Sequence, residues 1–223
     1  MSKHFWFRTR YVSAHASQIS DLHPHVLGLR FCPSKMASFF ASATRLFPAF
    51  AQSWIQAVFP EWFLPGRAVL KTQKPGEEQE IMEEYFDTEV KAYQRLNPLQ
   101  GAIIPKFYGL LRYNGTRAML LEYLGGISLS APEGATMTLE ELSSLLQPCY
   151  QALNAFDVFQ DDANLSNFQL VDGKIKVLDF ESAVFHYSAD QRATFLASSV
   201  HHLAQYYLSM QAYYRHEGSL EAA

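Results

Sequence analysis

The sequence predicts an α+β domain, in which helices pack on antiparallel strands instead of alternating with parallel ones. Two pairs of strand-like segments are joined by Asn114-Gly115 and Asp172-Gly173, which are strong signals for short hairpins. Segments with helical spacing of apolar residues separate these pairs. The composition agrees, because 223 residues with 48% hydrophobic and 18% charged side chains can bury a core, and this excludes a disordered or collagen-like chain.

The first elements of this domain follow a turn at Pro65-Gly66. Residues 67–71 predict a short strand. Residues 77–96 predict a helix, because apolar residues recur at a spacing of three or four with acidic residues on the other face. Asn97-Pro98 then ends this helix, since proline cannot continue it.

The rest of the chain predicts two hairpins and two helices. Thr138 and Glu141 have the spacing of a capping box, in which each side chain satisfies the backbone N–H of the other, so a helix begins there. In chain order, the expected elements are strands over 106–113 and 118–123, a helix from Thr138 to about Phe156, strands over 168–171 and 174–178, and a helix over 189–214.

Residues 1–60 differ from the rest of the chain in charge. They carry six basic side chains and one acidic one, a balance of +5, whereas the remaining residues carry −9. A Ser-, Phe-, Ala- and Arg-rich segment that is nearly free of acid is typical of a mitochondrial presequence, and residues 36–45 are suitably amphipathic. The plainer interpretation is a basic, poorly ordered extension over 1–61, or a helix packed on a domain over 62–223. A third interpretation of this basic segment is non-specific binding to anions. His23 and His25 could hold a metal but fit an ordinary loop better.

Polar side chains that suit phosphate chemistry lie in the second half of the chain. Asp162 and Asn167 are five residues apart in an irregular segment, and Asp179 ends the second strand of a hairpin. Two carboxylates and an amide make a hard-oxygen cluster of the kind that Mg²⁺ prefers. Phosphoryl transfer also needs a cation on the phosphates. Lys71 could supply it, paired with Glu89 on the exposed side of the next helix.

Each candidate also has a purely structural interpretation. Lys71 could be a solvated charge on an edge strand. Asp162 and Asn167 could simply cap a loop, as these residue types often do.

These motifs together resemble the protein-kinase-like superfamily, within it the aminoglycoside phosphotransferase and choline kinase branch, and short kinase-like proteins of filamentous fungi. The resemblance covers about residues 64–185. Its motifs are the strand lysine in Ala68-Val-Leu-Lys71, the helix glutamate Glu89, an inter-lobe hinge in Leu120-Leu-Glu-Tyr-Leu-Gly-Gly126, the catalytic loop with Asp162 and Asn167, and the metal-binding triplet Asp179-Phe-Glu181.

The resemblance implies a truncated two-lobed kinase-like fold, with a small antiparallel sheet and one helix over 62–124 and a reduced helical lobe over 125–223. It implies an enzyme that uses ATP and Mg²⁺ to phosphorylate a hydroxyl of a protein or small molecule. The implied roles are catalytic for Asp162, Lys71 and Glu89, adenine binding by the backbone of Glu122, Tyr123 and Leu124, phosphate binding by Lys71, and Mg²⁺ binding by Asn167 and Asp179.

Three departures from the family pattern favour an alternative, a pseudokinase that binds a nucleotide or a partner without turnover. Gln160 stands where the family usually has a bracing His, no glycine lies between Gly28 and Gly66, and only about 40 residues follow Asp179. If the resemblance holds, residues 40–65 should form the two strands that cover a nucleotide. In a third interpretation, the chain is a fragmentary or misassembled gene product whose first 60 residues replaced the lost strands.

The remaining expectations concern partners and location. No charge-free run of about 18 apolar residues occurs, so we expect no membrane span, and we also expect a monomer that binds no nucleic acid. Cys32 and Cys149 match no metal spacing and favour a reducing compartment. The cytoplasm is the expected location, with the mitochondrion as the alternative.

Overall fold

The computed structural model describes residues 2–21, 23–76 and 78–220. It contains 43% helix and 27% strand, which confirms the α+β class. The chain divides into two compact units. Unit 1 joins residues 1–77 with 106–123, and unit 2 joins residues 78–105 with 124–223.

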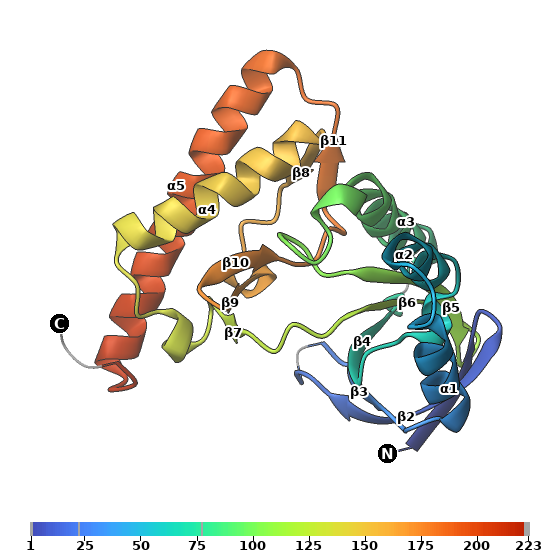
Figure 1. The fold of residues 1–223 in the computed structure, drawn as a ribbon. Coiled ribbons are helices and arrows are strands. Elements are labelled where there is room, and N and C mark those ends of the chain that lie inside the picture. The colour runs from blue at the N-terminus through green and yellow to red at the C-terminus, as the bar shows by residue number, and fades with distance from the viewer. Residues whose placement is uncertain (1, 22, 77, 221–223) are drawn as a thin grey trace. The chain divides into compact units, whose positions relative to one another are not determined.

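Unit 1 is built on a six-stranded antiparallel sheet that curls on itself (Figure 1). Strands β1 and β5 lie at opposite ends of the strand order, yet they are in contact. Gly109 of β5 has a φ of +139° and faces the Phe7 ring, which a Cβ would approach to 3.5 Å. In spatial order the strands are β1 (Ser2–Phe7), β2 (Arg10–Gln18), β3 (Val26–Phe31), β4 (Arg67–Thr72), β6 (Thr116–Glu122) and β5 (Phe107–Tyr113).

Residues 1–61 differ from the expected extension, because they supply three of the six strands. Phe5 and Phe7 of β1 alternate with exposed or half-buried residues, as do Val12 and Ala14 of β2, so one face of each strand enters the core. Leu29, Ala68 and Leu70, among others, complete that core. The predicted boundary at residue 62 therefore crosses a continuous sheet.

Two helices connect β3 to β4, namely α1 (Lys35–Thr44) and α2 (Ala49–Val58), followed by the 3₁₀ turn η1 (Pro60–Trp62). The strands expected over 40–65 are therefore not formed. The end of this connection is fixed to the start of β2. Thr9 Oγ1 donates to Glu61 Oε1 at 2.7 Å, and Arg10 Nη1 donates to the Glu61 carbonyl at 2.8 Å. The Trp62 ring packs on Phe40 of α1 with ring centroids 4.6 Å apart.

Unit 2 combines three long helices with two small sheets (Figure 1). The two predicted hairpin turns are confirmed, at Asn114-Gly115 in unit 1 and Asp172-Gly173 in unit 2, and so is the Thr138–Glu141 capping box. The elements are α3 (Gln79–Arg95), η2 (Asn97–Leu99), β7 (Ile127–Ser128), η3 (Pro132–Gly134), α4 (Leu139–Ala155), β8 (Val158–Gln160), η4 (Leu165–Asn167), β9 (Phe168–Val171), β10 (Lys174–Val177), β11 (Ala183–Phe185) and α5 (Ala189–His216). The predicted start of α3 at Glu77 lies outside the described residues.

Helices α4 and α5 pack together, and α5 is also tied to the segment before α4. The Tyr207 hydroxyl donates to the Gly134 carbonyl at 2.8 Å and accepts from the Met137 N–H at 2.9 Å. Among the residues described, no helix has the length and apolar character needed to cross a membrane.

Candidate functional site

The loop after β8 brings two of the predicted site residues into direct contact. Asn167 Nδ2 donates to Asp162 Oδ2 at 2.9 Å. Asn167 is buried at the end of η4, whereas Asp162 is exposed. Asn164 shapes the turn between them, because its Oδ1 accepts from the Ser166 N–H at 3.0 Å. The exposed carboxylate is thus held in place by a buried amide.

Asp179 is joined to the same loop through the backbone. The Leu178 N–H donates to the Asn167 carbonyl at 2.7 Å. Gln160 Nε2 donates to the carbonyls of Leu178, at 3.0 Å, and Asp179. Gln160 is only 1% exposed. The residue that departs from the family pattern therefore holds the Asp179 backbone against β8.

The backbone of Asp179 is in the left-handed region, with a φ of +56°. Asn114 and Asp172 also have a positive φ, but they occupy hairpin turns in which that conformation is expected. Asp179 instead follows the end of β10. A non-glycine residue in this region is uncommon and persists where its surroundings fix it, which is frequent at functional sites.

Helix α3 places Glu89 and Tyr93 one turn apart, and both are buried. The sequence predicted Glu89 on the exposed side of the helix, and this is wrong, since Glu89 is 1% exposed. Burial raises the pKa of Tyr93, and the negative charges of Glu89 and Asp179 raise it further. The Tyr93 ring also packs edge-on against Phe180, with centroids 5.5 Å apart. Glu89 and Asp179 therefore lie near the same buried phenol.

Helix α4 contributes a second buried phenol, that of Tyr150. Burial raises its pKa, and the charges of Asp162 and Asp161 add to this effect. Its ring lies 5.9 Å from that of Phe168, the first residue of β9. The sequence analysis missed Tyr93 and Tyr150, because each occupies an ordinary apolar position of its helix.

The remaining site candidates begin with Lys71 in unit 1. Lys71 is 7% exposed and sits in β4 between β3 and β6, opposite Val26 and Met119. The interpretation as a solvated edge charge is therefore wrong. Glu89 belongs to unit 2, so its pairing with Lys71 stays a prediction.

The hinge candidates lie at the end of β6. Glu122 Oε2 accepts from the Lys106 N–H at 3.1 Å, and the Arg67 guanidinium stacks on the Tyr123 ring at 3.7 Å from its centroid. Leu124 begins the next segment of unit 2, so adenine binding by residues 122–124 stays a prediction.

The carboxylates of Asp162 and Asp179 and the amide of Asn167 suit a metal ion whose remaining coordination positions are filled by a bound ligand. In the described part of the chain, no three His, Cys, Asp or Glu side chains gather closely enough to form a metal cage, and this includes His23 and His25. Mg²⁺ does not need such a cage, because it takes one or two carboxylates and completes its shell with phosphate oxygens and water. Asn167 uses Nδ2 in its bond to Asp162, so this bond does not occupy its amide oxygen.

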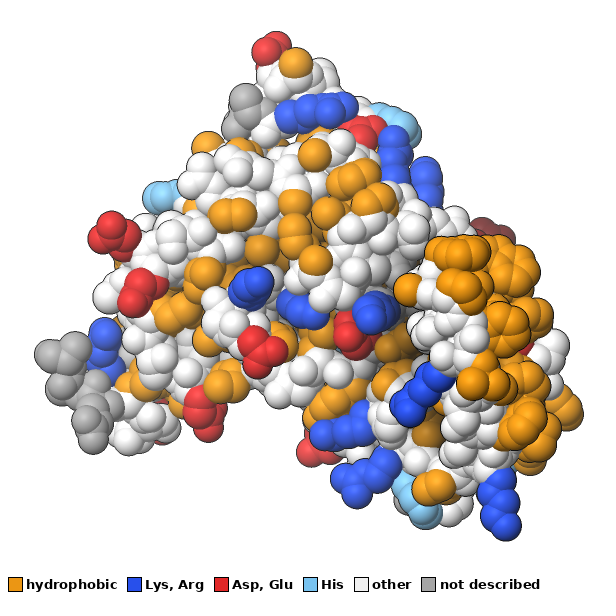
Figure 2. Space-filling model, in the orientation of Figure 1, with side chains coloured by type: hydrophobic (Ala, Val, Ile, Leu, Met, Phe, Trp, Pro, Cys, Tyr) orange, Lys and Arg blue, Asp and Glu red, His pale blue; other side chains and the backbone are white. Residues whose placement is uncertain are grey.

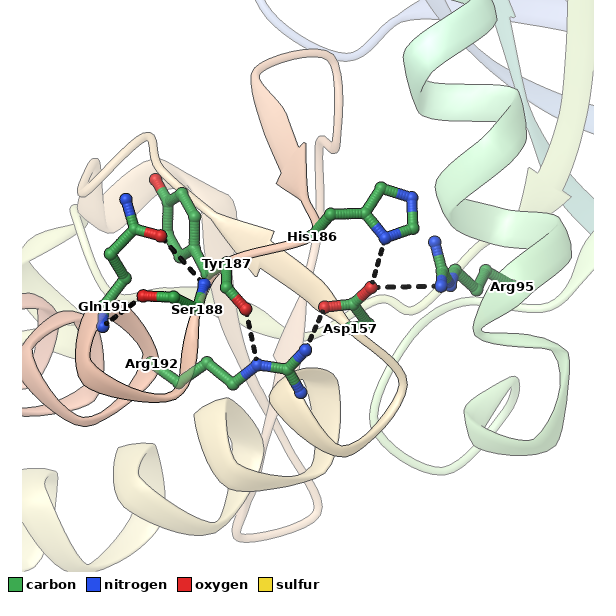
Figure 3. A network of polar contacts seen from close by, with 7 residues as sticks. All are labelled: Arg95, Asp157, His186, Tyr187, Ser188, Gln191 and Arg192. Atoms are coloured by element: carbon green, nitrogen blue, oxygen red, sulfur yellow. Dashed lines mark hydrogen bonds and ion pairs between the residues drawn. The ribbon is translucent and has the colours of Figure 1, made fainter.

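Asp157 connects α3, α5 and the segment after β11 within unit 2 (Figure 3). It was not among the residues predicted from the sequence. Its carboxylate lies 3.1 Å from Arg95 Nη2 at the end of α3, 2.8 Å from Arg192 Nη2 in α5 and 2.8 Å from His186 Nδ1. Arg192 Nε also donates to the Tyr187 carbonyl at 2.9 Å. No local pattern could reveal this cluster, because Arg95 and Arg192 are 62 and 35 residues away along the chain.

No protein-family model matches the chain, and a search of curated proteins finds no significant match. The kinase-like interpretation therefore depends on the order of the motifs and on the contacts described above.

Proposed function

We propose that the protein binds ATP with Mg²⁺ through a kinase-like site and transfers the γ-phosphoryl group to a hydroxyl acceptor, a protein or a small molecule. The observation that carries the proposal is the connected group of Asp162, Asn167 and Asp179. The Asn167 side chain bonds to Asp162, and the Asn167 carbonyl accepts from the N–H beside Asp179. Two hydrogen bonds thereby join Asp162 to Asn167, and Asn167 to Leu178, the residue before Asp179.

Each residue of the group has a role that suits its surroundings. The exposed carboxylate of Asp162 can accept the proton of the acceptor hydroxyl as its oxygen bonds to the γ-phosphorus. The bond from that phosphorus to the bridging oxygen breaks, and ADP leaves with the electron pair. Asn167 and Asp179 would hold Mg²⁺, which supplies charge neutralisation at the phosphate oxygens when bound. The resemblance gives Lys71 the role of neutralising the other phosphates.

A pseudokinase is the second candidate, and the connection between β2 and β3 favours it. Residues 19–25 join these strands and contain no glycine, and β3 pairs directly with β4, the strand of Lys71. Glycine permits the close backbone approach by which N–H groups cradle phosphates. A site without this cradle could bind a nucleotide and fail to align its γ-phosphate.

Thermal unfolding of the full chain with Mg²⁺ and ATP tests binding. At a ligand concentration of about 100 Kd, binding adds about 2.7 kcal/mol, which for a chain of this size raises Tm by roughly 5–10 °C. We expect this shift to depend on Mg²⁺ and to be lost in Asp179→Asn. Asp172→Asn, which changes an exposed turn aspartate that also has a positive φ, is the matched control. No shift at millimolar nucleotide would contradict both the enzyme and a pseudokinase that binds a nucleotide.

ATP consumption with a panel of alcohols and peptides then separates the two candidates. An enzyme should lose turnover in Asp162→Asn but keep it in Asp161→Asn, a change at the neighbouring exposed carboxylate. If wild type and Asp162→Asn bind nucleotide but consume ATP at the same background rate, the protein is the pseudokinase.

A further inference from the structure

The two helices between β3 and β4 expose an unusual amount of apolar surface. Leu46, Phe50 and Trp54 are 87%, 78% and 64% exposed. Figure 2 shows hydrophobic side chains gathered over α1 and α2, on the right of the view. We call this surface the α1–α2 patch and define it by Met36, Phe39, Leu46, Phe47, Phe50 and Trp54.

The spacing of these residues places them on the outward side of their helices. In α2, Phe50, Trp54 and Val58 recur every four residues and so share one face, and all three are exposed. No residue of α2 is buried. The contacts to the rest of unit 1 come from other positions, such as Phe40 against Trp62 and the bonds to Glu61. The pair is therefore joined to the strands through η1, while the apolar side chains of the patch remain exposed.

The charged residues of the two helices and of the turn between them are all basic. No Asp or Glu occurs between Asp21 and Glu61, and Glu61 is buried and bonded to β2 and its preceding turn. Lys35 at the start of α1 and Arg45 between the helices are exposed. Arg8 Nη1 donates to the Val58 carbonyl at the end of α2. Lys35 and Arg45 thus place exposed cations at one end of the pair and at its middle, whereas Arg8 Nη1 at the other end also lies 3.9 Å from Glu61 Oε2.

Exposed Phe, Trp and Leu side chains bordered by Lys and Arg match the interface of an anionic membrane, where apolar groups enter the acyl boundary and cations meet lipid headgroups. Each helix has 10 residues and is therefore about 15 Å long, half the thickness of the hydrocarbon core. Such helices lie in the plane of the interface and do not cross it.

A second copy of the chain fits this surface less well. In a two-fold dimer the same patch faces itself, and the charged side chains that meet around its apolar centre would then be Lys and Arg on both copies. We therefore propose that the α1–α2 patch adsorbs to anionic lipid bilayers and places unit 1 on a membrane surface.

Flotation of the full chain with lipid vesicles tests the proposal. We expect the protein to float with vesicles of phosphatidylcholine that contain about 30% phosphatidylserine, less with phosphatidylcholine alone, and less again at about 0.5 M salt. The double variant Phe50→Ser/Trp54→Ser should bind at least about tenfold more weakly, because both side chains are lost from the apolar face. Its Tm should be unchanged, since neither side chain is buried.

A matched control replaces two exposed aromatic residues outside the patch. Trp6 and Tyr11 lie on β1 and β2 and are exposed to a similar degree, so Trp6→Ser/Tyr11→Ser should bind vesicles like wild type. Lys35→Gln/Arg45→Gln should lose the preference for phosphatidylserine and keep the weaker binding to phosphatidylcholine.

Three outcomes would overturn the proposal. The first is a lack of flotation with phosphatidylserine vesicles at low salt, and the second is equal binding by wild type and Phe50→Ser/Trp54→Ser. The third is binding to another partner without vesicle binding. A dimer that the same variant dissociates would assign the patch to a second copy, and binding to polyglutamate would assign it to an acidic protein.

Discussion

The Asp162–Asn167–Asp179 group and the α1–α2 patch depart from the usual distribution of side chains in opposite directions. In the first, the polar side chains of Gln160 and Asn167 are buried and bonded, and in the second, large apolar side chains such as Leu46 are exposed. The N–H groups of the Gln160 and Asn167 amides are bonded, which fixes the local geometry, although the buried Gln160 Oε1 accepts no hydrogen bond from the described residues. A fixed geometry of this kind suits a small charged ligand. Binding of an exposed apolar face to any broad apolar surface is favourable, because it removes apolar area from water. The two proposals therefore assign ligands of different kinds to the two regions.

The largest effect on stability is expected at Gln160. Gln160→Leu keeps a similar volume but leaves the carbonyls of Leu178 and Asp179 without this donor, so the free energy of unfolding should fall by about 2–3 kcal/mol. Urea denaturation measures the loss. Gln94→Leu, at an exposed position of α3, should change it by less than about 0.5 kcal/mol. Gln160→His keeps an N–H donor and should recover part of the loss. Equal stability of Gln160→Leu and wild type would contradict the proposed brace.

A smaller effect is expected at Asp157. Asp157→Asn removes the charge that faces Arg95 and Arg192, while Asn tolerates the positive φ of 58° at this position. Because both arginines are partly exposed, the loss should be about 1 kcal/mol and should shrink at high salt. Asp172→Asn in the exposed turn should have no measurable effect. A loss that does not depend on salt would show that the carboxylate acts as a hydrogen-bond acceptor and not through its charge.

The two cysteines differ in burial, so the reactivity of their thiols reports on two different parts of the chain. Cys149 of α4 is buried and its thiol donates to the Ile175 carbonyl, whereas Cys32, which precedes α1, is half-buried. Burial raises the pKa of Cys149 to about 11, so we expect Cys32 to react first with a thiol reagent near pH 8 and Cys149 to react only on unfolding. Labelling of both thiols at the same rate would contradict the burial of Cys149 in the folded protein.

The same shift predicts a dependence of stability on pH. A thiol with a raised pKa in the folded state keeps its proton longer than in the unfolded state. Its contribution to stability is therefore complete below 9.0, the ordinary pKa of a cysteine thiol, and is lost as the pH rises towards 11. Cys149→Ala should flatten the decline of Tm over that range, and an unchanged slope would contradict the effect.

Local sequence signals predicted the elements that depend on neighbouring residues. The turns at Asn114-Gly115 and Asp172-Gly173 and the capping box at Thr138 each follow from two residues close in sequence, and all three are confirmed. Strands β1 to β3 were missed because the Ser- and Arg-rich composition favoured an extension. The alternation of Phe5 with Phe7, and of Val12 with Ala14, was the available signal.

For the candidate site too, local spacing predicted some residues, whereas others depend on contacts between distant segments. The spacing of Asp162 and Asn167 predicted two residues that the loop does bring together. The burial of Glu89, the brace by Gln160 and the cluster on Asp157 depend on contacts between distant segments, and no single-sequence pattern encodes those contacts.

The most direct test of the central claim is the position of a divalent cation relative to individual backbone amides. With an ATP analogue that cannot be hydrolysed, trace Mn²⁺ in place of Mg²⁺ should broaden the ¹H–¹⁵N resonances of Asn167 and Asp179 selectively, because a paramagnetic ion acts only at short range. Unaffected resonances at Asn167 and Asp179, or uniform broadening across the chain, would contradict the proposed metal and nucleotide site.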